Sequence, residues 1–284
     1  MTTRWKYPGD APLPPARNSR VAFILERLCK ASAEAKFTWI MPSRSQRCMN
    51  MNIFKFYHMS KNEIATLNAS LNKEAEIYRE LKKQPDWWQR LLLIKGVYVE
   101  IRKDDIVDVY YEGGRMAELR CKSKRITATC HPKYRGMDVP IGSNPKYVDC
   151  LEVLKNNPFF IIKNIQANYS QKDGKDEEDI SEKKIQGDMI CRQNSLFLDS
   201  EFAHRYEIGK RQTIRFDLVM IKNNQLIFIE LKRIKDNRML NKEDDEPEIL
   251  EQMDKYQKFI KVNKDKLLDY YKTLYEINTL LILT

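Results

Sequence analysis

The pattern of apolar and polar positions predicts a chain of mixed helices and strands. Between residues 97 and 131, four short stretches rich in Val, Ile, Tyr and Thr follow one another, and Gly113 and Gly114 mark a turn between the second and third. This composition, bounded by turn residues, favours strands. Because the stretches are consecutive, we expect a four-strand antiparallel meander.

A second β region has the sequence FDLVMIKNNQLIFIELK. Its two apolar runs flank Asn223 and Asn224, which tolerate the positive φ of a tight hairpin turn. With the turn centred between the asparagines, residues whose numbers sum to 447 face each other, so Asp217 lies opposite Glu230. The period-two geometry of a strand puts Lys232 on the same face as Glu230. The hairpin therefore predicts that two carboxylates and an ammonium group converge.

Helical segments are predicted on both sides of this hairpin. Glu182 lies in the first turn of one segment, and residues 248–261 form another, with apolar residues at helical spacing. Gln252 and Tyr256 are an i, i+4 pair on the second helix. A further helix is expected over residues 264–276, and the TLLIL run that follows is typical of a strand.

The opposed acids of the hairpin allow two interpretations. Asp217 and Glu230 repel each other unless a cation lies between them. A hard divalent cation with oxygen ligands, above all Mg²⁺, satisfies that requirement. The alternative is a surface hairpin whose carboxylates pair with Lys232, Arg233 or Arg215 as an ordinary salt-bridge cluster. The hairpin by itself leaves both open.

Taken together, these elements resemble the core of the PD-(D/E)XK nuclease superfamily. The common order is a helix with Glu, a strand with Asp, a strand with Glu-x-Lys and a helix, here with the Gln-x-x-x-Tyr motif of RecB-type members. The run IELKR is also similar to the hairpin of mismatch-cleaving endonucleases of that superfamily. The family's proline before the first strand acid is absent, because Phe216 stands there. The matching positions are Glu182, Asp217, Glu230, Lys232, Gln252 and Tyr256.

The resemblance implies a fold, an activity and a metal. The expected fold is a restriction-endonuclease-like core, a mixed sheet flanked by helices, over residues 175–284. The expected activity is hydrolysis of phosphodiester bonds with Mg²⁺ or Mn²⁺. Asp217, Glu230 and the Leu231 carbonyl would hold the ion, and Glu182 would complete the shell directly or through a water.

Roles for the remaining motif residues also follow from the resemblance. Lys232 would orient the attacking water or neutralise charge in the transition state. Gln252 and Tyr256 would position the site or contact the nucleic-acid strand. Packing in the core is the alternative for Tyr256.

Charge is unevenly distributed along the 284 residues. The net charge is +10, and residues 1–165 hold 29 Lys and Arg against 17 Asp and Glu, whereas the rest holds 21 against 23. A basic field favours a polyanionic partner. The charged, apolar-poor stretch 168–179 predicts a linker. We therefore expect an α+β or α/β chain with a basic N-terminal domain over residues 1–170 and a nuclease-like domain over residues 175–284.

Composition narrows the cellular setting. A hydrophobic content of 42% is sufficient for real cores, yet no run of about 18 apolar residues predicts a membrane span. The N-terminus has charges and prolines but no apolar segment of a secretory signal. Six cysteines show no zinc or iron–sulfur spacing. These features favour reduced cysteines, a cytoplasmic location and no membrane.

The favoured hypothesis is a metal-dependent nuclease, with DNA preferred to RNA as substrate and the N-terminal domain helping to bind it. One alternative is a catalytically inactive nuclease fold that binds nucleic acid or protein. Another is an interaction protein whose basic N-terminal half is the active part. A homodimer or a partner protein is compatible with each of them.

Overall fold

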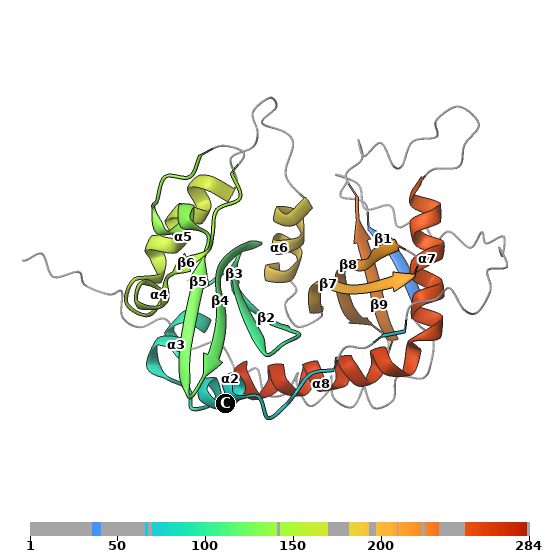
Figure 1. Ribbon diagram of the computed structural model, residues 1–284, viewed down its shortest axis with the longest axis horizontal. Helices are drawn as coiled ribbons and strands as arrows, with labels where there is room; N and C mark the ends of the chain where they lie inside the picture. The colour runs from blue at the N-terminus through green and yellow to red at the C-terminus, as the bar shows by residue number, and fades with distance from the viewer. Residues whose placement is uncertain are drawn as a thin grey trace, which may run out of the picture.

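The computed structural model describes residues 36–40, 66–67, 70–140, 143–169, 182–192, 197–208, 210–222, 225–232 and 248–282. Within these residues the chain forms two β-sheets and the helices that pack on them (Figure 1). The strands are β1 (Lys36–Ile40), β2 (Val97–Arg102), β3 (Ile106–Tyr111), β4 (Gly114–Lys122), β5 (Arg125–Cys130), β6 (Val148–Asp149), β7 (Phe197–Ile208), β8 (Lys210–Lys222) and β9 (Gln225–Leu231). The helices are α2 (Glu76–Lys82), α3 (Asp86–Leu92), the 3₁₀ helix η2 (Pro132–Arg135), α4 (Leu151–Asn156), α5 (Pro158–Tyr169), α6 (Glu182–Arg192), α7 (Glu248–Val262) and α8 (Lys264–Ile282).

The five-stranded sheet contains the predicted meander, which is confirmed. Strands β2 to β5 pair antiparallel in sequence order, and the short β6 adds a fifth strand beside β5. Its turns use left-handed backbone, with φ between 53° and 63° at Asp104, Asp105, Ser123 and Lys124. Such φ values match the right-handed twist of the strands that a tight hairpin joins.

The four-stranded sheet has the order β1-β9-β8-β7 and contains the predicted hairpin. Strands β8 and β9 pair from Leu218 with Ile229 to Lys222 with Gln225, and each pair sums to 447, so the predicted register is confirmed. Strand β7 runs antiparallel to β8, whereas β1 runs parallel to β9. The sheet is therefore mixed.

Strand β1 comes from the N-terminal part of the chain, and its pairing joins the two sides of the predicted domain boundary. It lies at residues 36–40 yet pairs with β9, which belongs to the region 175–284. The predicted linker begins inside α5, which continues to Tyr169, and residues 170–181 lie outside the described part of the chain. The α+β class is confirmed, while the restriction-endonuclease-like core and the two-domain division stay predictions.

Of the two C-terminal helices, α8 contacts both sheets. Helix α7 lies where the apolar spacing predicts it. The prediction of a strand at TLLIL is wrong, because α8 continues through this segment to Ile282. Buried Tyr271, Leu274, Ile277 and Leu281 continue one helical face along α8, and Figure 1 shows this helix passing below both sheets, against α2, β2 and β7.

Among the described helices, none combines the length and the apolar character that a membrane span requires.

Helix α6 lies between the two sheets (Figure 1) and packs against β2 and β4 through a glycine. A Cβ atom added to Gly187 would lie 2.4 Å from the backbone nitrogen of Gly113 and 2.5 Å from the carbonyl carbon of Glu112. Backbone atoms cannot move aside as a flexible side chain can. Gly187 therefore sets how closely α6 approaches the β3–β4 turn.

We expect Gly187→Ala to lower the free energy of unfolding by about 1–3 kcal/mol, the usual cost of overpacking. Urea unfolding would measure it, with Asp188→Ala on the same helix as the control. Ala is better than Gly in a helix interior by about 1 kcal/mol. A stabilised Gly187→Ala variant would therefore contradict the close contact.

Candidate active site

Two carboxylates lie together on the β8–β9 hairpin. One step beyond the pair Leu218 and Ile229, the same register puts Asp217 opposite Glu230. Asp217 is half-buried, and its Oδ2 accepts a 2.6 Å hydrogen bond from the backbone N–H of Leu231. Glu230 has only 3% of its surface exposed. The hairpin thus brings both predicted acids to one place.

Lys232 supplies a buried cation beside these acids. It is 3% exposed, and its Nζ donates hydrogen bonds to Oε1 of Glu230 and, at 2.9 Å, to the carbonyl oxygen of Leu231. The alternative interpretation from the sequence was an exposed salt-bridge cluster, but the pair of Lys232 and Glu230 is shielded from water. That alternative also included Arg215, which is exposed, and Arg233, which lies outside the described residues.

The Gln-x-x-x-Tyr pair of α7 reaches the same carboxylate. Nε2 of Gln252 donates to Oε1 of Glu230 at 2.8 Å and also to the hydroxyl oxygen of Tyr256. Tyr256 is buried, and its ring packs edge-on against Phe216 with centroids 5.0 Å apart. Burial, and then the charge of Glu230, raise the pKa of Tyr256 to about 12. Tyr256 thus combines core packing with support for the site through Gln252.

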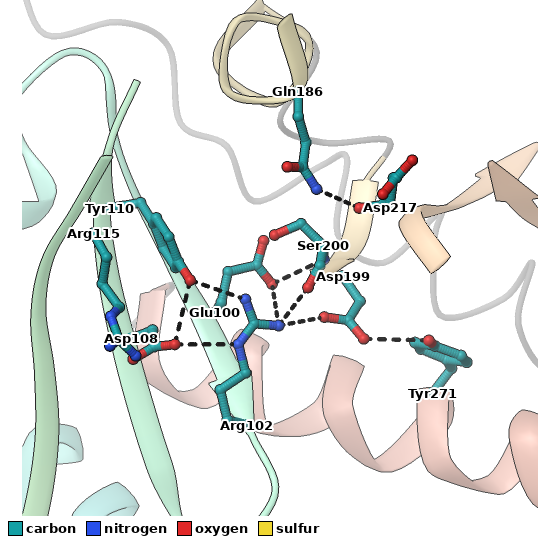
Figure 2. A network of polar contacts seen from close by, with 10 residues as sticks. All are labelled: Glu100, Arg102, Asp108, Tyr110, Arg115, Gln186, Asp199, Ser200, Asp217 and Tyr271. Atoms are coloured by element: carbon teal, nitrogen blue, oxygen red, sulfur yellow. Dashed lines mark hydrogen bonds and ion pairs between the residues drawn. The ribbon is translucent and has the colours of Figure 1, made fainter. Parts of the chain in front are cut away.

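Helix α6 contributes a residue that sequence reasoning missed. Glu182 is the first residue of α6, and its side chain is outside the described part. Gln186, one helical turn later, is buried, and its Nε2 donates a hydrogen bond to the carbonyl oxygen of Asp217 (Figure 2). The four-residue spacing from Glu182 was the available signal, because i and i+4 positions share a helix face.

Strand β7 adds a third acid to the neighbourhood. Ser200 pairs with Leu218 and Phe202 with Phe216, so the register puts Glu201 opposite Asp217. Glu201 has a φ of 56°, which is rare for a residue other than glycine, and it is absent from the paired positions of the strand. No sequence motif marked Glu201, since its position depends on this local irregularity.

Burial and the neighbouring acids change the pKa of Asp217. Burial, followed by the charge of Glu230, raises the pKa of Asp217 to about 7. The Leu231 N–H and the Lys232 ammonium act in the opposite direction, and Glu201 adds a further increase. Near neutral pH the Asp217 carboxyl therefore exchanges a proton readily, and an added cation would favour its ionised form.

The donors at this site fit a hard divalent cation. Asp217 and Glu230 offer carboxylate oxygens and Leu231 offers a carbonyl oxygen, and Mg²⁺ binds through one or two carboxylates plus substrate phosphates. Among the side chains that the structure describes, no three His, Cys, Asp or Glu residues converge into a metal-binding group. Lys232 contacts two of the three donors, so an ion that used both would displace its ammonium.

A second polar cluster lies where the two sheets meet, next to this site (Figure 2). Arg102 of β2 donates to Asp199 of β7 at 2.9 Å, to the carbonyl oxygen of Ser200, and to Asp108 of β3 at 3.3 Å. Glu100 accepts from the backbone N–H of Ser200 at 3.3 Å. These acids are buried, so Arg102 is the cation that compensates them and ties β2 to β7.

Two acids of this cluster carry raised pKa values. Burial raises the pKa of Glu100 to about 8 and that of Asp199 to about 6, while Arg102 opposes both shifts. Tyr271 of α8 donates a 3.2 Å hydrogen bond to the second carboxylate oxygen of Asp199. The pair therefore retains a proton near neutral pH, which reduces the negative charge around Arg102.

The chain matches no protein family model, no curated protein and no solved structure. The resemblance to PD-(D/E)XK nucleases therefore depends on the residues and their geometry alone, and it stays a prediction.

Proposed function

We propose that the chain is a metal-dependent nuclease that hydrolyses phosphodiester bonds, with DNA as the favoured substrate. The observation that supports this proposal is that Lys232, just after β9, and Gln252 of α7 both bond to the buried Glu230 carboxylate, beside Asp217, which accepts from the Leu231 N–H. The hairpin register predicts that Asp217 faces Glu230, but local sequence patterns do not predict that Gln252 reaches the same carboxylate. A buried carboxylate with an ammonium and an amide on the same oxygen is also costly to build, which favours a functional reason for it.

Each residue has a role in this proposal. Asp217 and Glu230, with the Leu231 carbonyl, would hold Mg²⁺ or Mn²⁺, which supplies an acidified water and polarises the phosphate. Lys232 would neutralise charge as it develops on the phosphate. Gln252 holds the Glu230 carboxylate in orientation. Further residues that would position these groups are Gln186 through the Asp217 backbone and Tyr256 through Gln252.

The first test is cleavage by the native chain. Single-stranded, double-stranded, nicked and mismatched DNA, with an RNA control, are incubated in Mg²⁺, Mn²⁺ or EDTA. We expect cutting in the divalent metals and none in EDTA. Equal cutting in EDTA would contradict metal dependence, and no cutting of any substrate would contradict the proposed activity for the isolated chain.

A catalytically inactive nuclease fold is the second candidate, and Lys232 is the observation in its favour. Its ammonium already satisfies Glu230 Oε1 and the Leu231 carbonyl without any metal. Such a site could persist as a structural ion pair in a protein that binds nucleic acid or protein. Retained nucleic-acid binding without cutting, and without any effect of Mg²⁺ on stability, would favour this candidate.

Metal binding should stabilise the chain in a pH-dependent manner. The folded-state pKa of Asp217 is raised to about 7, so without metal its contribution to stability is present at low pH and is lost as the pH rises through 7. Mg²⁺ binds the ionised form and competes with the proton. At about 100 times its Kd, Mg²⁺ would add about 2.7 kcal/mol, or roughly 5–10 °C in Tm.

We expect this Mg²⁺-induced rise in Tm at pH 8 and little rise at pH 5.5, measured by thermal unfolding at constant ionic strength. Comparing each pH with and without Mg²⁺ removes the contribution of other titrating groups. The same rise at both pH values would show that the ion binds elsewhere.

A further inference from the structure

Exposed aromatic and apolar side chains gather around η2 and the start of α5. The exposed fractions are 64% for Phe159, 39% for Phe160, 52% for Met137 and 48% for Tyr147. These four residues define what we call the η2–α5 face. Large contiguous apolar patches on a protein surface usually mark a binding site.

Contacts made by neighbouring residues bring the segments that carry the η2–α5 face together. A Cβ atom on Gly136, next to Met137, would lie 3.1 Å from Cζ of Phe160. The Tyr147 ring stands edge-on to His131 at 6.1 Å, and the His131 ring lies 5.4 Å from that of Tyr134 in η2. The rings thus belong to one surface built from η2, α5 and the segment before β6.

Cations lie among these rings. Arg115 lies over the Tyr147 ring at 4.8 Å, and Lys163 is four residues after Phe159, on the same face of α5. The other cations are Lys133 and Arg135 of η2 and Lys146. Within the part of the chain that the structure describes, none of Lys133, Arg135, Lys146 and Lys163 forms an ion pair.

Among the described residues, Arg115 is paired with Asp108 and Glu118, whereas the acids nearest the other four cations have different partners. Glu152 pairs with Lys155 at 3.3 Å, and Asp149 accepts from the backbone N–H of Leu151 at 3.2 Å. Asp138 is the remaining acid between η2 and β6. Strands β4 and β5 also carry cations, but they are a weaker candidate for binding a polyanion, because Arg115 and Arg120 both pair with Glu118.

We propose that the η2–α5 face binds single-stranded nucleic acid, with unpaired bases stacking on Phe159, Phe160 and Tyr147 and the phosphates held by the surrounding cations. Aromatic rings interleaved with cations are the combination that single strands require, since every base has a face that can stack. Bases inside a duplex are already stacked on each other. The inference rests on the proposed function in taking nucleic acid as the polyanion, and it adds the strandedness of the substrate.

The test measures binding by the full native chain in EDTA, where metal-dependent cleavage cannot occur. Fluorescence anisotropy with a labelled thymidine oligonucleotide, a labelled uridine oligonucleotide and a duplex of equal length gives three affinities. Replacing Phe159→Ala and Phe160→Ala together should weaken single-strand binding at least about tenfold and duplex binding less than twofold. Phe159 is 64% exposed but Phe160 only 39%, so we expect the thermal midpoint to fall slightly, and binding is measured well below it.

A matched control replaces exposed apolar residues elsewhere, Leu93→Ala and Val262→Ala, and should change no affinity. The double variant Lys133→Gln and Lys163→Gln should reduce the slope of log affinity against log salt by about 1.4 for single strands, about 0.7 for each phosphate contact. Similar affinities for the thymidine and uridine oligonucleotides would support stacking of the bases of both DNA and RNA strands on these rings.

Three outcomes would overturn the proposal. One is unchanged single-strand affinity in the Phe159 and Phe160 variant. Another is an equal loss for duplex, which would indicate charge alone. The third is unchanged oligonucleotide binding with loss of self-association in sedimentation, which would assign the face to a protein partner. Because binding is measured without metal, failure of cleavage leaves this result intact, and failure of binding leaves the cleavage result intact.

Discussion

Replacing Asp217→Asn is expected to abolish metal-dependent cleavage, with a loss of at least about 10²–10³-fold. The amide keeps the size of the side chain and an oxygen for the Leu231 N–H, but it removes the charge that would hold the cation. Because burial already raises the pKa of this carboxyl, a neutral side chain should be tolerated by the fold. The rate of cleavage of a labelled substrate at pH 8 measures the effect.

The matched control is Asp254→Asn on α7, an acid that pairs with Lys258 one turn away. This variant should cleave at the native rate. The Asp217→Asn chain should also lose the Mg²⁺-induced rise in Tm while retaining binding to single strands in EDTA. Cleavage at the native rate by Asp217→Asn would remove Asp217 from the mechanism and with it the assignment of the hairpin as the active site.

Replacing Arg102→Ala is expected to destabilise the folded chain by about 3–5 kcal/mol, the range for breaking a buried ion pair by removing one partner. The substitution leaves Glu100 and Asp199 buried without their cation, while Asp108 keeps its ion pair with Arg115. It also removes the Arg102 bonds to Asp199 and to the Ser200 carbonyl oxygen of β7. Urea unfolding at pH 7 would measure the loss.

The destabilisation by Arg102→Ala should depend on pH. Without the cation, fewer charges oppose protonation of Glu100 and Asp199, so acid should relieve part of the repulsion and the variant should be closest to native near pH 5. Arg120→Ala, which breaks the more exposed pair with Glu118, should change stability by less than about 1 kcal/mol. An Arg102→Ala chain as stable as native at pH 8 would show that the cluster does not hold the sheets together.

Local chemistry explains which parts of the site could be predicted from the sequence. The sequence has Asn223 and Asn224 between the two apolar runs, and a two-residue turn fixes the register of the strands that it joins. The alignment of Asp217 with Glu230 therefore followed from counting residues. The placement of Gln252 next to Tyr256 followed in the same way from the helical repeat, because residues four apart share a face.

Other features depended on contacts between distant segments. Whether the Gln252 amide would reach Glu230 depended on how α7 packs against the sheet. The continuation of α8 through TLLIL was mispredicted because an apolar run favours strand and buried helix alike, and only the packing of Leu274, Ile277 and Leu281 decides between them.

The sequence by itself determined the meander, the hairpin with its register, and the helix that carries the Gln-x-x-x-Tyr pair, because each depends on residues close together along the chain. Only the tertiary structure decided that β1 joins β9, that Gln186 holds the backbone of Asp217, and that Arg102 ties the two sheets together. These contacts join residues that are 31 to 191 positions apart. No periodicity along the chain encodes such pairs, since they form only when folding brings separate elements into contact.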